Sequence, residues 1–282
     1  MKLLFCLLIL CTISTTKAVE TVTNGTTFYN TTDNISSSLS SWSSGWGTGN
    51  TNDGWNYVGN VAGTGANASG VYLGNGWVIT AGHVGAGVFN INGNAYDTTG
   101  VSYSDFTNSS TGTSIADLTL FQISTTSTTG TNISLPSLTI TSSTPSGKMV
   151  MIGYGGGKSW GINTISSIGQ IVSVNSFQSI DLYTQYGTYR SGSKNVTNSA
   201  VLVGGDSGGG DFVKLASTWQ LVGLNEAVSS SNSYFVQLSA YDSQIQSIIT
   251  TAVPEPTTWA LIGLSVIALI GSSLWKNRKR IA

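Results

Sequence analysis

The sequence contains very little cysteine, histidine and charge, and each shortage limits the chemistry that the protein can perform. Both cysteines, Cys6 and Cys11, lie in an apolar N-terminal segment. If that segment is removed on export, the remaining chain has no disulfide, no zinc-thiolate site and no cysteine nucleophile. The single histidine, His83, is the one side chain with an ordinary pKa of about 6.5, so acid-base chemistry near neutral pH must use it.

Charged residues make up only 8% of the chain, whereas soluble domains commonly contain about a quarter. Between Val19 and Pro256 there are twelve acidic and five basic residues, which gives this part of the chain a net charge of −7. A protein that binds nucleic acid through its phosphates needs a basic stripe. The acidic balance therefore argues against nucleic acid as a partner.

The N-terminus has the pattern of a secretory signal peptide. One lysine is followed by an apolar run over residues 3–13 and then by small and polar residues. This pattern predicts a signal peptide over residues 1–18 that signal peptidase removes before Val19. A lipoprotein-type cut at Cys11 is the alternative, but Leu10 stands where that motif has a small residue.

The C-terminus, residues 253–282, contains a second targeting signal. A Pro-Glu-Pro turn precedes an uncharged stretch over residues 257–275, and a cluster of lysine and arginine follows. Nineteen residues of helix span about 28 Å, enough to cross a membrane, and the basic cluster would keep the body outside. The order of these elements resembles the bacterial PEP-CTERM sorting signals, which implies export and processing by an exosortase. A plain transmembrane anchor is the alternative and has the same topology.

Residues 19–52 are rich in Ser, Thr, Asn and Gly and are predicted to form a flexible leader. From residue 53 to 252 the pattern changes to short apolar runs separated by glycine turns, which predicts an all-β barrel or sandwich. Asn75-Gly76 is a strong signal for a tight hairpin. Helical spacing occurs only over residues 240–252. The runs predicted as strands are 55–61, 69–80, 87–93, 115–124, 137–143, 148–155, 169–176, 179–186, 219–228 and 233–241.

A candidate nucleophile, Ser207, stands in the glycine-rich sequence VGGDSGGG. A serine hydroxyl is a poor nucleophile, so it needs a base within hydrogen-bond reach and donors aimed at the developing oxyanion. The N–H groups of Gly205 and Ser207 are the natural donors. His83 in WVITAGHV is the only candidate base, and Asp117 in SIADLTLFQI is the best candidate to orient it. Together they give the chain order His, Asp, Ser.

With these motifs the sequence resembles the trypsin/chymotrypsin family of serine proteases over most of residues 55–252. The resemblance implies two packed antiparallel six-stranded β-barrels, over about residues 53–135 and 136–252, with a C-terminal helix and an active site between the barrels. It implies that His83 is the general base, that Asp117 orients it and that Ser207 is the nucleophile, with no metal or cofactor.

Two other aspartates, Asp97 and Asp105, also lie between the histidine and the serine in the sequence. Both stand in loop or strand-edge contexts, where a carboxylate is simply solvated. Asp117 is instead flanked by Ile115 and Ala116, an apolar setting that suits a buried residue behind the histidine.

The sequence departs from the family in ways that affect activation. Vertebrate-type members begin their mature chain with an Ile-Val-Gly-Gly-like sequence whose amine pairs with the aspartate before the nucleophile. No such start precedes His83 at the expected distance, so Asp206 needs another partner, and we expect activity without a newly cut N-terminus. Gly210 replaces the usual proline, and the family's disulfides are absent.

The residue six positions before the nucleophile forms the floor of the specificity pocket in this family, and here it is Val201. An apolar floor gives a cation no partner, so the sequence predicts cleavage after apolar or aromatic residues. Glu226 is the residue that could bring a carboxylate into this pocket and reverse the preference.

The expected function is a secreted or envelope-anchored serine endopeptidase that hydrolyses polypeptides through an acyl-enzyme. An inactive trypsin-like fold that acts as a surface or matrix binding protein is the alternative. A Ser/Thr/Asn-rich adhesin, in which the serine motif is only a turn, leaves the lone histidine unexplained. All three triad residue types are retained in order, which favours the enzyme.

Overall fold

The computed structural model describes residues 18–23, 26–31, 54–62, 68–186, 199–215 and 218–251. The chain divides into two units at Asp242, so the β-rich body is described separately from the short helix α1 (Asp242–Thr251) that follows it. The predicted membrane span at residues 257–275 and nearly all of the signal peptide lie outside the described residues. Among the described helices, none is long and apolar enough to cross a membrane.

The first half of the body forms a seven-stranded antiparallel sheet in the order β7-β6-β3-β4-β5-β9-β8. The prediction of a six-stranded first barrel is therefore wrong in strand number, and the sheet of the described residues is open, with β7 and β8 at its edges. The additional strand arises because the tight turn at Asn92-Gly93 folds the chain back on itself. The strands are β3 (Val58–Ala62), β4 (Ala68–Gly74), β5 (Trp77–Thr80), β6 (Val88–Ile91), β7 (Asn94–Tyr96), β8 (Thr98–Tyr103) and β9 (Thr119–Ile123).

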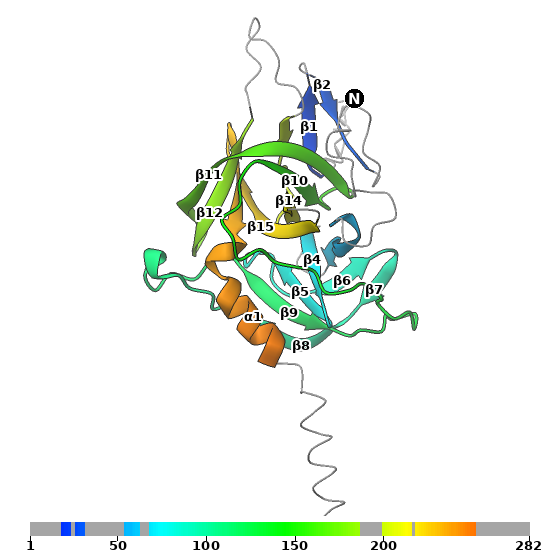
Figure 1. Cartoon of the computed structure of the whole chain (residues 1–282). Helices are drawn as coiled ribbons and strands as arrows, with labels where there is room; N and C mark the ends of the chain where they lie inside the picture. The colour runs from blue at the N-terminus through cyan, green and yellow to red at the C-terminus, as the bar shows by residue number, and fades with distance from the viewer. Residues whose placement is uncertain are drawn as a thin grey trace, which may run out of the picture. The chain divides into compact units, whose positions relative to one another are not determined.

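The second half of the body forms a closed six-stranded barrel in the order β10-β11-β12-β16-β15-β14, as the resemblance implied (Figure 1). All pairings are antiparallel, and buried aliphatic and aromatic side chains fill the interior. The strands are β10 (Lys148–Gly153), β11 (Ser159–Val174), β12 (Phe177–Gln185), β14 (Gly210–Leu215), β15 (Thr218–Val228) and β16 (Asn232–Gln237).

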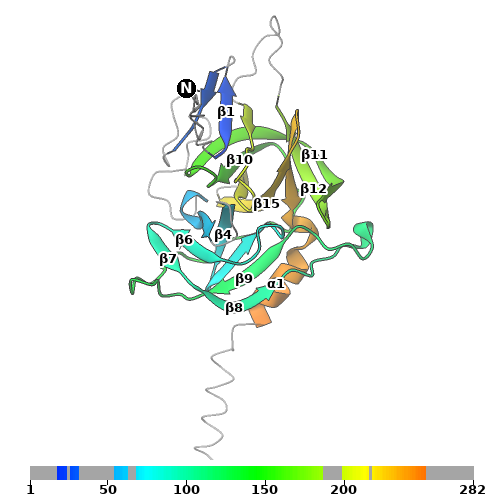
Figure 2. The ribbon, with the colours of Figure 1, turned by 180° about the vertical axis from the view of Figure 1, so that it is seen from behind.

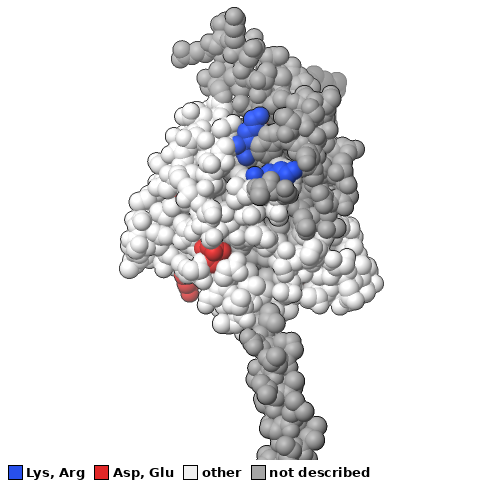
Figure 3. All heavy atoms as spheres, viewed as in Figure 1, with Lys and Arg blue, Asp and Glu red and all other residues white. Residues whose placement is uncertain are grey.

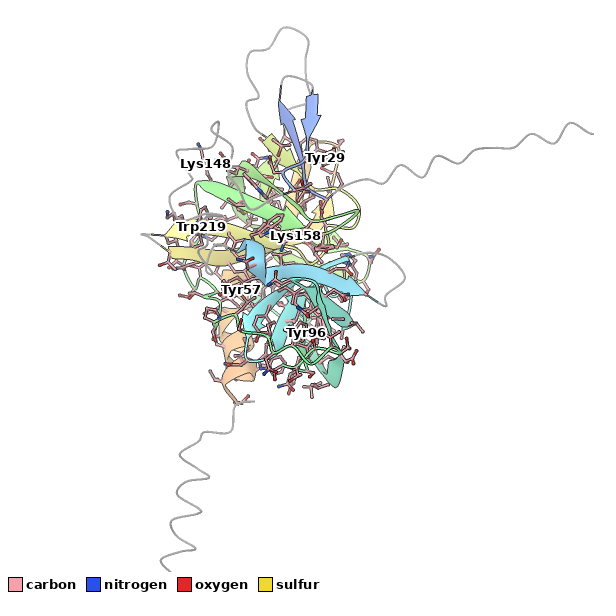
Figure 4. The ribbon with its side chains drawn as sticks, turned by 90° about the vertical axis from the view of Figure 1, so that its right-hand side faces the viewer. Tyr29, Tyr57, Tyr96, Lys148, Lys158 and Trp219 are labelled. Carbon is pink, nitrogen blue, oxygen red and sulfur yellow. The ribbon has the colours of Figure 1, made fainter. Side chains whose placement is uncertain are left out.

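A third, three-stranded sheet holds the N-terminal part of the described chain beside the second barrel (Figures 1 and 2). It consists of β1 (Glu20–Thr23), β2 (Thr26–Phe28) and β13 (Ser199–Val201). Tyr29 follows β2 and its hydroxyl donates to Glu20 Oε1 at 2.7 Å (Figure 4).

These N-terminal residues were predicted to belong to a flexible leader, and the structure corrects this assignment. Val19 is fully buried in the same apolar cluster as Met149, Leu182 and Phe235 of the second barrel. Burial of the Val19 side chain and the ladder between β1 and β13 hold the segment in place. The remaining parts of the predicted leader, residues 24–25 and 32–52, lie outside the described residues.

The segment between the two halves of the body runs over both of them. Residues 137–143 were predicted as a strand, but here they make only an isolated bridge between Ile140 and Leu221. Leu138 N donates to Leu73 O of the first sheet at 3.0 Å, and Thr141 N donates to Leu221 O of the barrel at 3.0 Å. Three short 3₁₀ helices complete the described body: η2 (Trp55–Tyr57), η3 (Ser109–Thr111) and η4 (Leu238–Ala240).

The surface reflects the low charge of the sequence. Figure 3 shows one face on which most of the described surface belongs to neither acidic nor basic residues. One of the few cations, Lys158, donates to Trp55 O and lies 4.4 Å from the centre of the Trp55 ring. Most of the exposed polar surface is thus made of hydroxyl and amide groups.

The predicted hairpin at Asn75-Gly76 is confirmed, because these residues join β4 to β5 with φ angles of 53° and 80°. Asn92-Gly93, with φ angles of 50° and 77°, joins β6 to β7 in the same way. Positive φ at both central residues gives a turn whose twist matches that of the strands.

The two glycines allow strain and steric crowding to be separated. A Cβ at Gly76 would lie 2.9 Å from Ile123 O, whereas a Cβ at Gly93 would meet nothing within 4 Å. We therefore expect Gly93→Ala to lower the free energy of unfolding by about 1 kcal/mol through backbone strain alone, and Gly76→Ala by about 2 kcal/mol or more. Urea unfolding of both variants measures the difference. Equal losses would show that the Ile123 carbonyl does not restrict the turn.

Candidate active site

His83 follows β5 in a short turn and is bonded twice to Asp117. Its ring Nδ1 lies 2.6 Å from Asp117 Oδ2, and its backbone N donates to Asp117 Oδ1 at 2.7 Å. The His83 side chain is 25% exposed, whereas that of Asp117 is fully buried. Because Nδ1 carries the proton toward a carboxylate, Nε2 is left as a proton acceptor on a partly exposed ring.

This pairing changes the acid-base properties of His83. The hydrogen bond that His83 donates to Asp117 raises the pKa of His83 above 6.5, although burial acts in the opposite direction. Asp97 and Asp105, the alternative partners in the sequence, are both exposed. Asp117 is therefore the aspartate that the structure brings to the histidine.

The loop that carries Ser207 contacts the turn that carries His83. Gly208 has a φ of 81°, and a Cβ there would overlap Thr80 Oγ1 and lie 3.0 Å from Ala81 N. Only glycine allows this approach, which brings the residue after Ser207 against the two residues that precede Gly82 and His83. Within the described residues, no hydrogen bond joins Ser207 Oγ to His83 Nε2. Such bonds are often long in unliganded enzymes and tighten when substrate binds.

Ser69, a fully buried residue of β4, fixes this loop to the first sheet. Its N–H donates to Ser207 O at 2.8 Å, and its carbonyl accepts from Thr80 Oγ1 at 2.7 Å. Its hydroxyl accepts from Tyr154 N at 2.8 Å and faces Gly205 O at 3.4 Å. One small side chain and its backbone thus connect the serine loop, the histidine turn and the barrel.

The backbone donors of the serine loop fall into two groups. The N–H groups of Asp206, Gly208 and Gly209 donate to Val203 O, Asn225 O and Asp206 O. In the described part of the chain, the N–H groups of Gly205 and Ser207 have no acceptor. These are the two donors that the sequence assigned to an oxyanion hole, and they are available to a ligand.

Asp206 lies beneath this loop and is 1% exposed. Its carboxylate accepts from Val203 N at 2.8 Å and from Val19 N at 3.2 Å, and Gly155 N–H also bonds to it. Burial raises the pKa of Asp206 to about 7, and these three N–H groups act in the opposite direction. Gly153 leaves room for the carboxylate, because a Cβ there would overlap it.

Val19 is the first residue after the predicted signal-peptidase cut. The other partner that Asp206 was expected to need is thus the backbone N–H of Val19, much farther from His83 in sequence than the family pattern suggests. The sequence there is VETV, which does not resemble Ile-Val-Gly-Gly. The cut would replace the amide of Val19 with an ammonium group at the same position.

The two residues assigned to the specificity pocket lie in different surroundings. Val201 is 8% exposed, ends β13 and pairs with Glu20 of β1. Glu226 is 4% exposed, and its Oε1 accepts from Ser179 Oγ at 3.0 Å. Ser179 also accepts from Asp117 N at 2.9 Å, so Glu226 is joined to the Asp117 network. Their part in a pocket remains a prediction.

Three supporting residues, Ser69, Ser179 and Asn225, carried no signal in the sequence. Asn225 Nδ2 donates to Ile152 O at 2.9 Å and to Asp206 O at 3.1 Å, which anchors the serine loop to the barrel. Each of these residues stands in a strand that mixes apolar and polar residues. Only the alternation of buried polar residues within apolar runs could have indicated them.

Comparisons with known proteins bear on the targeting signal and the fold. Residues 252–279 match the PEP-CTERM protein-sorting motif, which directs the protein to the cell envelope with C-terminal processing or anchoring. A comparison with curated proteins gives no match.

Among solved structures, the body is similar to proteases at low sequence identity. The inactive form of the Rv3671c protease is 16% identical, with 69% of this chain and 90% of that chain covered and a TM-score of 0.48. The active form of Rv3671c protease from M. tuberculosis is 16% identical, with coverages of 68% and 81% and a TM-score of 0.49. The HtrA-type protease AlgW with a tripeptide is 19% identical, with coverages of 69% and 60% and a TM-score of 0.46.

The contact between Val19 N and Asp206 predicts that the cut chain is more stable than the uncut one. In the uncut chain the raised pKa of Asp206 means that stability falls as pH rises from 3.8 to about 7. An ammonium group at Val19 offsets this loss, because a charged donor adds about 2 kcal/mol at a buried carboxylate. At pH 7.5, we expect a protein that begins at Val19 to unfold at higher urea than one that retains residues before it.

Asp206→Asn supplies the control for this comparison. The amide keeps the shape of the side chain but has no charge, so the two N-terminal forms of this variant should unfold together. A stability difference that persists in Asp206→Asn, or is absent from the wild type, would exclude a charge-pair role for Val19.

Proposed function

We propose that the protein is an exported serine endopeptidase, with Ser207 as nucleophile, His83 as general base and acid, and Asp117 as the residue that orients His83. The observation that carries this proposal is the Asp117-His83 pair together with the contact of Gly208 on Thr80 and Ala81. The pair supplies a base with one free ring nitrogen on a partly exposed side chain. The contact joins the loop of Ser207 to residues just before that base.

The chemistry follows from these groups. Ser207 Oγ attacks the scissile carbonyl while His83 Nε2 takes the hydroxyl proton. The fully buried Asp117 carboxylate stabilises the imidazolium that forms, and the imidazolium then protonates the leaving amine. Water deacylates the ester on Ser207 by the same steps. Gly205 N–H and Ser207 N–H, which have no acceptor among the described residues, would stabilise the oxyanion.

The alternative is a trypsin-like fold without activity that serves as a surface or matrix binding protein. A binding protein would have no functional requirement for the hydrogen-bonded Asp117-His83 pair. Nor would it require the N–H donors of Gly205 and Ser207, which have no acceptor among the described residues. The sorting motif is compatible with both functions, because it specifies only export to the envelope.

One prediction of the proposed function concerns the nucleophile. We expect a fluorophosphonate probe to label Ser207, and we expect Ser207→Ala or His83→Ala to lower peptidase turnover by about 10³-fold or more, since the triad acts as a unit. Mass spectrometry of the labelled peptide and turnover of a casein substrate provide the readouts. A folded wild-type protein that resists the probe would favour the binding alternative.

Another prediction of the proposed function concerns the residue before the scissile bond. Val201 offers no charge, and Glu226 is engaged by Ser179, so a cationic side chain would enter the pocket without a partner. Burial of an apolar side chain contributes about 1.5 to 3 kcal/mol, which corresponds to a preference of about ten- to a hundredfold. A peptide library should show cleavage after apolar or aromatic residues. Dominant cleavage after Lys or Arg would identify Glu226 as the anion of the pocket.

A further inference from the structure

Ser179 connects Asp117 to a second pair of buried acids that the chemistry above does not use. It lies on β12 and is fully buried. Its Oγ accepts from Asp117 N at 2.9 Å and donates to Glu226 Oε1 at 3.0 Å. The single hydroxyl proton is therefore committed to Glu226 and one of the two acceptor lone pairs to Asp117 N–H, so donation runs from Asp117 through Ser179 to Glu226.

Asp181 lies two residues further along β12, so its side chain is on the same face of the strand as Ser179. It is fully buried, and its carboxyl group lies beside that of Glu226. Within the described residues, Glu226 Oε2 and both oxygens of Asp181 accept no hydrogen bond from any donor. Two carboxyl groups can hydrogen-bond to each other only when one of them carries a proton.

Burial and the neighbouring Glu226 raise the pKa of Asp181 well above its ordinary value, so Asp181 holds this proton. Burial also raises the pKa of Glu226, but the bonds from Asp181 and Ser179 act against this and favour its ionised form. The other titratable groups that act on the pair are Asp117, His83 and Tyr241. Tyr241 is neutral at physiological pH, and its hydroxyl accepts from Ile180 N at 2.9 Å.

We propose that Ser179, Glu226 and Asp181 form a positioning array behind Asp117, in which the carboxyl pair holds one proton and one negative charge and acts on His83 through Asp117. The array belongs to β12 and β15 of the barrel, whereas His83 follows β5 and Asp117 precedes β9, two strands of the first sheet. It therefore fixes the Asp117 backbone across the boundary between the two halves. Its charge favours the imidazolium form of His83. Any effect on turnover rests on the proposed function, but the effect on His83 does not.

The experiment uses the fact that the protein has a single histidine. Imidazole ¹⁵N resonances of histidine-labelled protein report the pKa of His83 directly and need no assignment and no activity. In the double variant Asp181→Asn/Glu226→Gln the amides preserve the hydrogen bonds without the charge. We expect this variant to lower the pKa of His83 by about 0.5 to 1 unit. In the peptidase, the acid limb of the pH profile should move by the same amount.

Two single variants serve as controls. Asp181→Asn removes the proton but leaves the Glu226 carboxylate, so the pKa of His83 should stay within about 0.2 units of wild type while the infrared band of a protonated carboxyl is lost. Asp105→Asn removes a charge from an exposed site and should change neither signal. If the double variant fails to fold, the infrared difference between wild type and Asp181→Asn still tests whether the pair shares a proton.

The outcomes separate the two proposals. An unchanged pKa of His83 in the folded double variant, or no protonated carboxyl band assigned to Asp181, would overturn the array. A shifted pKa in a protein that neither cleaves peptides nor reacts with the fluorophosphonate would support the array and overturn the peptidase assignment.

Discussion

The site depends on one constraint: a carboxylate removed from water must be surrounded by donors. Asp117 meets this requirement with two bonds from His83, and Asp206 meets it with backbone N–H groups that include that of Val19. Removal of such a charge from water costs several kcal/mol per ion when the donors are missing. The two carboxylates therefore hold the segments that supply the donors. This fixes the positions of the His83 turn and of the N-terminal segment that contains Val19.

The absence of cysteine from the body shifts this task to small polar side chains. Ser69, Ser179 and Asn225 each bond to two or more segments that are distant in sequence. Each forms hydrogen bonds in a buried, low-dielectric setting, where a lost partner costs more than at the surface. A few hydroxyl and amide groups thus connect the serine loop, the histidine turn and the barrel.

Much of the fold could be predicted from local patterns. The hairpin at Asn75-Gly76, the helix near residues 240–252 and most strands follow from turn residues and apolar runs. The strands that were missed are those without such a pattern. Both β1 and β13 are short, β8 is exposed over most of its length, and β14 begins at Gly210, the last glycine of the serine motif. Residues 137–143 have strand composition, yet they run between the two halves, where no neighbour pairs with them along their length.

The pairing of β1 with β13 has a consequence for how the protein is exported. Residues 20–22 pair with residues 199–201. Strand β1 therefore cannot pair until β13, which lies far along the chain, is present. Closure of so long a loop costs conformational entropy before any new contact offsets that cost. Non-local pairing of this kind therefore forms slowly. A chain that crosses the membrane from its N-terminus therefore cannot complete this sheet until residue 201 has passed. The topology itself delays the folding of the N-terminal segment during export.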